Sequence, residues 1–199
     1  MAMLRKSELI DAIATKNRGL FATPTDRVAI QRAIARLEDC NPTPNPLESP
    51  DLQGIWRLLY TTSIELLGID RLPLYRLGQI YQCIDTEAQR IYNLAEVEGP
   101  PLLEGLVSVS ATFTPVSRQR VTVGFERGVF GLQRALGYEN PRQFIQKLQA
   151  QAKLPLWQGI DFRINRDRQS GWLEVTYLDP TLRIGRGNEG NLFVLQKVA

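Results

Sequence analysis

The stretch that decides the fold is Gly54-Ile55-Trp56-Arg57-Leu58-Leu59-Tyr60-Thr61, where the apolar residues change from a helical repeat to a period of two. In an extended strand, Trp56, Leu58 and Tyr60 lie on one face, and two further aliphatic residues lie on the other. Both faces are therefore apolar, whereas a barrel wall in contact with water is expected to be polar outside. We infer that another part of the chain covers the outer face of this strand.

Similar alternation recurs through the rest of the chain, in runs separated by turn residues. The runs cover residues 78–85, 89–97, 106–114, 119–127, 161–165, 172–178, 182–186 and 191–197. About nine antiparallel strands joined by short turns predict a mainly β fold, either a closed barrel or a sandwich. A helical repeat over residues 141–152 predicts one helix inserted into this series.

The first forty residues carry the 3.6-residue repeat of amphipathic helices. Ser7 is the expected N-cap of a first helix, and Thr23-Pro24 is expected to begin a second. Four prolines within residues 41–50 exclude both a helix and a central strand there. We therefore expect a helical segment at 1–40 that packs on the barrel, a proline-rich linker at 41–51, and a barrel domain at 52–199.

The composition of the 199 residues excludes several kinds of site. Hydrophobic residues make up 43% and charged residues 23%, as in ordinary globular domains. The absence of histidine excludes a Ser-His-Asp triad and a His-ligated metal. Cys40 and Cys83 are too few for a thiolate metal cage and are typical of reduced, intracellular thiols. We predict no catalytic residue, no metal and no cofactor, and the lack of a run of about 18 apolar residues predicts no transmembrane helix.

The net charge is +3, and the basic excess is concentrated in one part of the chain. Residues 115–153 contain seven Lys or Arg residues against Glu126 and Glu139. Such a segment favours either an anionic surface, such as lipid headgroups, or an ordinary solvated face. No nucleic-acid-binding motif accompanies it, so we do not expect nucleic acid as a partner. The sequence predicts no particular oligomeric state.

Gly54 and Trp56 begin the first strand in a way that suits the closed end of a barrel. A glycine at this place lets the strand bend, and the tryptophan can then fill the end of the barrel. Such a plug is often completed by an arginine that stacks on the indole face. We expect this partner to be Arg183 or Arg186, with a structural role.

Three segments resemble the plastid-lipid-associated protein (fibrillin) family, over about residues 50–199. They are Leu52-Gln53-Gly54-Ile55-Trp56-Arg57-Leu58-Leu59-Tyr60-Thr61-Thr62, then Gly78-Gln79-Ile80-Tyr81-Gln82-x-Ile84-Asp85 with Asn93, and the closing stretch Tyr177-Leu178-Asp179-Pro180-Thr181-Leu182-Arg183-Ile184-Gly185-Arg186-Gly187-Asn188-x-Gly190-Asn191-Leu192-Phe193-Val194-Leu195. The resemblance implies a lipocalin-like antiparallel β-barrel that binds small hydrophobic molecules. It also implies peripheral association with thylakoids or lipid droplets, in a cyanobacterium or, after trimming, in a plastid. The N-terminus carries acidic residues and does not have the pattern of a transit peptide.

The inner wall of the expected barrel can be assigned from the alternation. If Trp56 points inward, Leu58 and Tyr60 do so as well. From the other strands we assign Tyr81, Val107, Val109, Val123, Phe125 and Tyr177 to the inner wall. A lining of this kind suits an isoprenoid, a quinone, a carotenoid or an acyl chain, unless the same residues fill the interior completely.

Three functions remain as hypotheses. The first is non-catalytic binding of a hydrophobic molecule, with peripheral docking on photosynthetic membranes or lipid droplets. The second is a structural or interaction protein with a solid barrel, which coats lipid bodies or scaffolds a partner enzyme. The third is a lyase that attaches linear tetrapyrroles; it rests on architectural analogy alone, and an inert buried Cys83 would argue against it.

Overall fold

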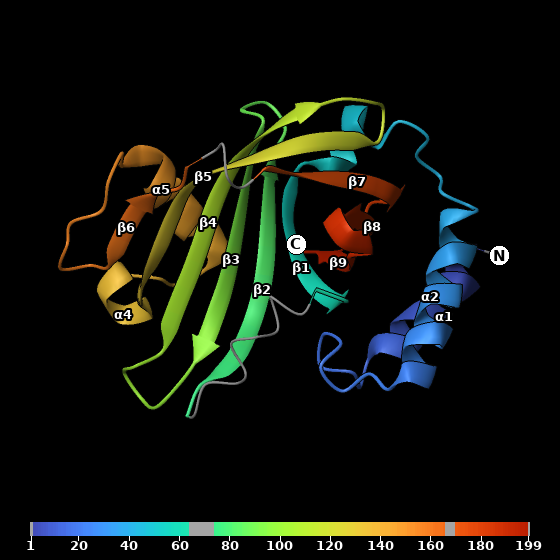
Figure 1. Cartoon of the computed structure of the whole chain (residues 1–199), viewed down its shortest axis with the longest axis horizontal. Helices are drawn as coiled ribbons and strands as arrows, with labels where there is room; N and C mark the ends of the chain where they lie inside the picture. The colour runs from blue at the N-terminus through green and yellow to red at the C-terminus, as the bar shows by residue number, and fades with distance from the viewer. Residues whose placement is uncertain (1, 64–73, 166–169, 199) are drawn as a thin grey trace.

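The structure is a computed structural model that describes residues 2–63, 74–165 and 170–198 (Figure 1). Its strands are β1 (Gly54–Thr61), β2 (Arg76–Asp85), β3 (Arg90–Glu98), β4 (Gly105–Pro115), β5 (Arg120–Leu132), β6 (Ile160–Arg163), β7 (Ser170–Leu178), β8 (Leu182–Gly187) and β9 (Leu192–Lys197). The order in the sheet is β4-β3-β2-β1-β9-β8-β7-β5-β6, with antiparallel neighbours, and an additional pairing of β4 with β5 closes it. The predicted mainly β barrel is confirmed: eight strands close on themselves, and β6 extends the sheet at the edge of β5.

Two pairs of helices lie on opposite sides of the barrel (Figure 1). The N-terminal pair is α1 (Ala2–Ile13) and α2 (Pro24–Glu38); the inserted pair is α4 (Gln133–Leu136) and α5 (Pro141–Ala150). The cap of α2 is the expected one. The Thr23 hydroxyl accepts a hydrogen bond from the backbone N–H of Asp26, and the Asp26 carboxylate accepts one from the backbone N–H of Thr23. The expected cap of the first helix is wrong: α1 begins at Ala2, and Ser7 lies inside it, where its hydroxyl donates to the Met3 carbonyl.

The proline-rich segment covers one end of the barrel. It forms two short 3-10 helices, η1 (Pro46–Glu48) and η2 (Pro50–Leu52). Leu47 and Leu52 pack against the inner core, and the Leu52 carbonyl accepts a hydrogen bond of 3.0 Å from the indole Nε1 of Trp56. The prolines therefore hold this segment in a fixed conformation against the barrel.

Three apolar clusters divide the core, one within the barrel and two outside its wall. The inner cluster draws on most barrel strands and includes Trp56 and Leu58. The second joins α1 and α2 to the outer face of β1, β7, β8 and β9, and the third joins α4 and α5 to the outer face of β2–β5. The outer face of β1 is thus covered, which explains why both faces of that strand are apolar.

Candidate functional site

The closed end of the barrel is built around Trp56, which is fully buried. The guanidinium carbon of Arg183 lies 5.0 Å from the centre of the indole ring, and the ammonium of Lys197 lies 5.3 Å from it. Both distances are in the range of cation–π contacts. Lys197 also donates to the backbone carbonyl of Asp51 at 2.6 Å, so this cation has an acceptor at the rim.

Of the two arginines expected to complete the plug, the structure brings Arg183 to Trp56 and takes Arg186 away from it. The two residues are three positions apart on β8, so their side chains leave opposite faces of the strand. Arg186 points to α2, where it forms a bidentate pair with Glu38 at 2.6 and 2.9 Å. The assignment of Arg186 to the plug was therefore wrong.

Arg183 is 1% exposed and lies inside the barrel. One nitrogen, Nη2, donates to the amide oxygen of Gln82, whose own nitrogen donates to Asn93 at 2.8 Å. The other two nitrogens, Nε and Nη1, have no hydrogen-bond partner among the described residues. Burial lowers the pKa of Arg183 to about 9, so the guanidinium is still charged near neutral pH.

Five of the residues assigned to the inner wall do face the interior together with Trp56. Leu58 and Val123 are buried in the inner cluster, and Phe125 packs against it. Val107 and Val109 pair with Ala95 and Asn93 of β3, and paired residues of an antiparallel ladder point to the same face. Ala95 packs against the inner cluster, which places both valines on the inner wall.

Tyr60 and Tyr177 face outward, contrary to the alternation, because a β-bulge precedes each of them. On β1, Leu58 pairs with Leu195 and Tyr60 with Val194, so one extra residue reverses the alternation. The same irregularity precedes Tyr177 on β7. Both tyrosines pack in the cluster beneath α1 and α2.

Tyr81 also faces outward, for a different reason. It packs against the cluster under α4 and α5, whereas Ile80 and Ile84 of the same strand belong to the inner cluster. The outer face of β2 is covered by helices, so hydrophobicity does not distinguish its two faces. The polar Gln82 is thus the residue that points inward, where Arg183 meets it.

Part of the inner wall is reached by water. The inward-facing residues that are only half-buried are Gln82, Asn93, Ala95, Val107, Val109, Phe125, Leu173 and Phe193. Side chains on an inner wall gain contact with water only from the interior space or its open end. Water therefore contacts these eight residues on the inner side of the wall.

The apolar inner wall continues onto an exposed surface where β5 extends beyond the barrel. There Phe130 pairs with Ile160 of β6 and with Val107 of β4, so all three side chains share one face. Phe162 lies on this face above Gly128, where a Cβ would meet the phenyl ring at 2.4 Å. Phe130, Ile160 and Phe162 are 50%, 62% and 50% exposed, and we call these three residues the apolar apron.

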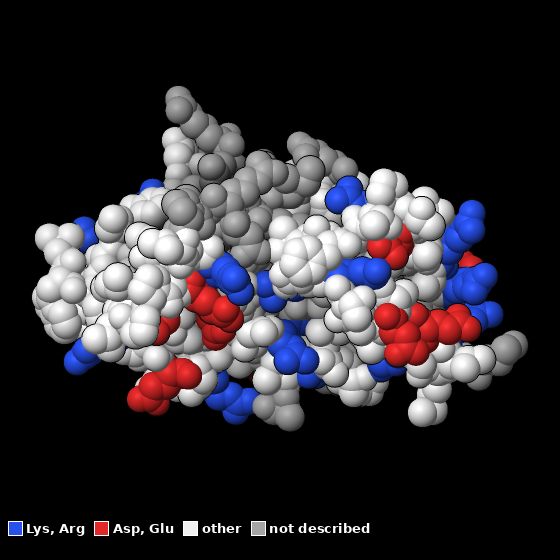
Figure 2. Space-filling view, turned by 90° about the horizontal axis from the view of Figure 1, so that it is seen from below, with Lys and Arg blue, Asp and Glu red and all other residues white. Residues whose placement is uncertain are grey.

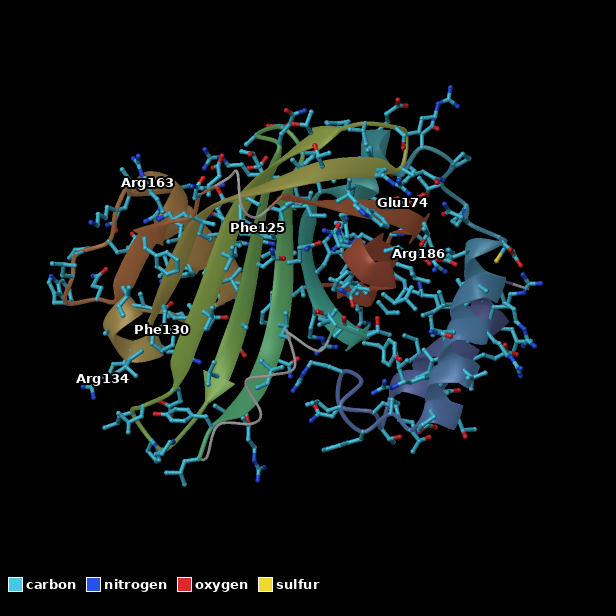
Figure 3. The ribbon with its side chains drawn as sticks, in the orientation of Figure 1. Phe125, Phe130, Arg134, Arg163, Glu174 and Arg186 are labelled. Carbon is cyan, nitrogen blue, oxygen red and sulfur yellow. The ribbon has the colours of Figure 1, made fainter. Side chains whose placement is uncertain are left out.

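The apron adjoins the interior but was not predicted from the sequence. Figure 3 shows Phe125 and Phe130 spaced along β5, which connects the inner wall to the apron. The usable signal was the pair Ile160-x-Phe162, which has the alternation of a strand with one apolar face. The expected strand at 161–165 left out Ile160 and hence this pattern.

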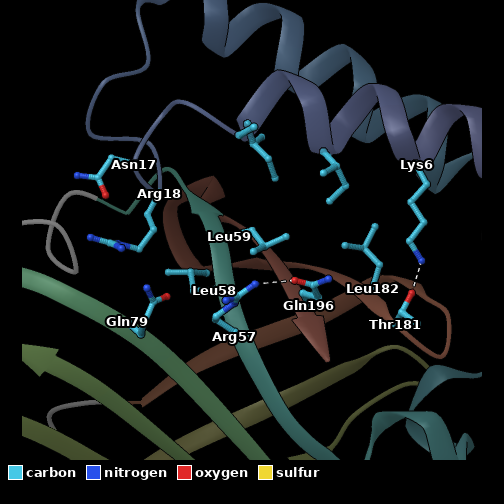
Figure 4. Close-up of a pocket in the computed structure, with 13 residues that line it drawn as sticks. Lys6, Asn17, Arg18, Arg57, Leu58, Leu59, Gln79, Thr181, Leu182 and Gln196 are labelled. Carbon is cyan, nitrogen blue, oxygen red and sulfur yellow. Dashed lines mark hydrogen bonds between the residues drawn. The ribbon is translucent and has the colours of Figure 1, made fainter. Parts of the chain in front are cut away.

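A cleft of about 430 Å³ lies outside the barrel, between α1 and β1 (Figure 4). Its apolar lining includes Ile10, Ile13 and Leu59, and its edges carry Lys6 and Arg57. Lys6 donates to the carboxylate of Asp179, and Arg57 donates to the side-chain oxygen of Gln196 at 2.8 Å. The first bond connects α1 to the barrel, and the second joins β1 to β9 within the barrel wall.

The basic excess of residues 115–153 does not act as one uniform surface. Arg120 pairs with Glu174 at 2.6 Å, and Arg127 pairs with Asp161 at 2.7 Å. On the face seen in Figure 2, basic and acidic side chains are interspersed. Pairing of this kind weakens the field that the sequence alone predicts for this segment.

The structure provides neither a reactive thiolate at Cys83 nor, among the described residues, a cluster of metal ligands. Burial, together with the charge of Asp85, raises the pKa of the Cys83 thiol to about 11, so the thiolate is scarce near neutral pH. Among the described residues, no group of three or more Cys, Asp or Glu side chains could hold a metal ion. No helix in the described part of the chain has the length and apolar character to cross a bilayer.

Comparison with known proteins places this fold in a family. The PAP_fibrillin family model matches residues 3–196. Plastoglobulin-1 of Pisum sativum (chloroplastic) is 35% identical over 225 residues, which cover 96% of this chain and 60% of the relative. A chloroplastic light-induced protein of Solanum tuberosum is 33% identical over 98% of this chain and 67% of its own length. A chromoplast-specific carotenoid-associated protein of Cucumis sativus is 33% identical over 96% of this chain and 67% of its own length.

This chain thus spans 60 to 67% of the length of these three relatives. No solved structure matches it.

Proposed function

The chain belongs to the PAP_fibrillin family, and on that premise we propose that its barrel binds a small hydrophobic molecule without converting it chemically. The molecule is an isoprenoid, a quinone, a carotenoid or an acyl lipid. The names of the relatives, a plastoglobulin and a carotenoid-associated protein, support an apolar ligand. We further propose a place at photosynthetic membranes or lipid droplets, in keeping with the chloroplastic and chromoplastic names of these relatives.

The observation that carries this proposal is the half-buried inner wall. Val107, Val109 and Phe125 are apolar, face the interior and are reached by water. An apolar ligand in the interior removes both its own surface and the apolar wall from contact with water. This burial stabilises the complex by roughly 25 cal/mol per Å² of apolar surface, before the entropic cost of ordering the ligand is subtracted. A barrel of eight strands has room for one small ligand when its side chains leave a space.

The apolar apron supports peripheral docking on a lipid surface. Its three side chains are exposed to water and adjoin the inner wall at Val107. An exposed apolar surface of this kind is typical of a protein or membrane interaction site. A ligand could then pass between a lipid phase and the barrel along a continuous apolar path. The same surface also favours the second hypothesis, a protein with a solid barrel that coats lipid bodies.

Ligand titrations separate these functions. We expect quinones, carotenoids or fatty acids to quench the tryptophan fluorescence of the purified protein in a saturable way. Ala95→Phe places a ring in the interior and should weaken binding at least tenfold. Thr122→Phe adds the same ring on the exposed face of β5 and should change the Kd less than threefold.

Two results would count against ligand binding in the barrel. One is the absence of saturable binding across the whole set of apolar ligands, with vesicle binding intact, which would favour the coat function. The other is an unchanged Kd in folded Ala95→Phe, which would place the ligand outside the barrel.

A further inference from the structure

We infer that Arg183 binds the carboxylate head of the ligand, so that the preferred cargo of the barrel is a long-chain apolar acid. This inference rests on the proposed function, because it names the class of molecule that the barrel binds. It follows from the unpaired hydrogen-bond donors of Arg183, the lack of an anion beside it, and the way the inner wall leads to it.

Arg183 carries a charge in a place where charges are rarely left unpaired. The residue is 1% exposed, and only Nη2 has an acceptor, the neutral amide oxygen of Gln82. Nε and Nη1 meet no acceptor among the described residues. A buried cation without an anion is strongly unfavourable, and buried N–H groups without acceptors add to that cost.

The protein supplies carboxylates to other arginines but not to this one. Arg186, on the same strand, pairs with Glu38, and Arg127 pairs with Asp161. Burial lowers the pKa of Arg183, and among the described residues no carboxylate accepts a hydrogen bond from its Nε or Nη1. The missing anion is therefore expected from the ligand.

Half-buried residues of the inner wall connect to Arg183 through hydrogen bonds, although the Nε and Nη1 atoms of Arg183 are themselves buried. Gln82 and Asn93 are half-buried amides on that wall, and Gln82 is one hydrogen bond away from the guanidinium. Beyond Asn93, the wall is lined by Ala95 and by Val109, which pairs with Asn93 across the ladder. A carboxylate at Arg183 thus places its hydrocarbon chain along small apolar residues, in the direction of the apron.

A carboxylate satisfies this site better than the other heads of apolar ligands do. It neutralises the guanidinium and offers two strong acceptor oxygens to the N–H groups. An ester or quinone oxygen accepts hydrogen bonds but leaves the charge unpaired. A carotene offers neither acceptor nor charge.

The test compares ligands that differ only in the head group. The probes are a conjugated polyene fatty acid, its methyl ester and the corresponding alcohol. Each probe is titrated into the wild-type protein at concentrations below those at which the probe itself aggregates. We expect the acid to bind at least tenfold more tightly than the ester or the alcohol. Arg183→Met keeps the apolar stem and removes the charge, and it should abolish this preference while leaving ester affinity within about threefold.

Arg186→Met is the matched control, because it removes an arginine from the opposite face of the same strand. It should keep the full preference for the acid. Equal binding of acid and ester to the wild type overturns the inference even if Arg183→Met does not fold, and so does a folded Arg183→Met that still prefers the acid. In either case the proposed function stands, since both ligands bind. If none of the three probes binds the wild type, this inference and the proposed binding of acyl chains in the barrel both fail.

Discussion

At the scale of single residues, Asp179 connects the helical segment to the barrel. The sequence marks Asp179-Pro180 as a hairpin turn, and the carboxylate does accept from the backbone N–H groups of Thr181 and Leu182, each at 2.7 Å. It also accepts from the Tyr177 hydroxyl at 2.8 Å and from Lys6 of α1 at 2.7 and 2.9 Å. One side chain therefore shapes a turn and anchors a helix that is distant in sequence.

This arrangement predicts how stability depends on pH. Burial alone would raise the pKa of Asp179, but the hydrogen bonds from Lys6, Thr181, Tyr177 and Leu182 lower it from 3.8 to about 2. A lowered pKa stabilises the folded state at pH values above the unfolded value, and this contribution disappears as the pH falls from about 4 to about 2. The lowered pKa of Asp179 thus contributes about 2 kcal/mol to the free energy of unfolding near neutral pH.

Asp179→Asn should therefore lower the free energy of unfolding by about 2 kcal/mol at pH 7. Urea titrations of both proteins at pH 7 and at acid pH measure this difference. It should shrink steadily below pH 4, because protonated wild type resembles the variant. A difference of the same size at pH 2.5 and at pH 7 would show that the loss is not electrostatic.

Residue-level prediction of the inner wall succeeded where alternation was undisturbed. Leu58 follows Trp56 by two residues with regular pairing to β9, and it faces inward as expected. Tyr60 and Tyr177 face outward because bulges add one residue, and no residue type in either strand marks a bulge. Tyr81 was misplaced because both faces of its strand are buried. Arg183 was singled out as a structural plug, and its unmet N–H groups became visible only in three dimensions.

At the scale of elements, the alternation located every strand of the barrel but stopped too early on β5. The expected strand ended at Arg127, whereas β5 continues to Leu132. The added residues 128–132 include two glycines, which is a weak strand signal, and they are held by pairing with β4 and β6. Because this extension carries Phe130, its omission also concealed the apolar apron.

The apron predicts which surface meets lipid. In the double variant Phe130→Ser, Ile160→Ser, co-sedimentation with zwitterionic phospholipid vesicles should fall at least fivefold, because two large apolar side chains are lost from the contact. Both are already at least half exposed, so the melting temperature should change by only a few degrees.

Phe21→Ser is the control for this experiment. Phe21 is 68% exposed and lies near the N-terminal helices, far from the apron in sequence. Its loss should leave vesicle binding within about twofold of the wild type. If Phe21→Ser reduces binding as strongly as the double variant does, general surface hydrophobicity accounts for the contact and the apron has no special role.

At the scale of the whole molecule, the proline-rich segment is a boundary in the sequence but not in the core. Leu9, Ile30 and Ile34 of the N-terminal helices are completely buried, in one cluster with Tyr60 and Ile184 of the barrel. Hydrogen-bonded ion pairs, from Glu38 to Arg186 and from Lys6 to Asp179, join the same two parts. Sequence reasoning predicted that the helices cover the first strand, since that strand is apolar on both faces. The depth of the shared core could not be predicted, because it depends on which strands the helices cross.

A shared core predicts that the helices and the barrel unfold together. All three tryptophans of the chain lie after residue 52, so their fluorescence reports on the barrel alone. Ile34→Ala removes a fully buried side chain from α2, and it should lower the free energy of unfolding by about 2–4 kcal/mol. Urea titrations should show the tryptophan transition shifting to lower urea by the same amount as the helical circular dichroism signal.

If the dichroism signal shifts and the tryptophan transition stays in place, the helices unfold on their own. The proline-rich segment would then be a boundary between two independently stable units, and the ion pairs of Glu38 and Lys6 would contribute little to holding them together.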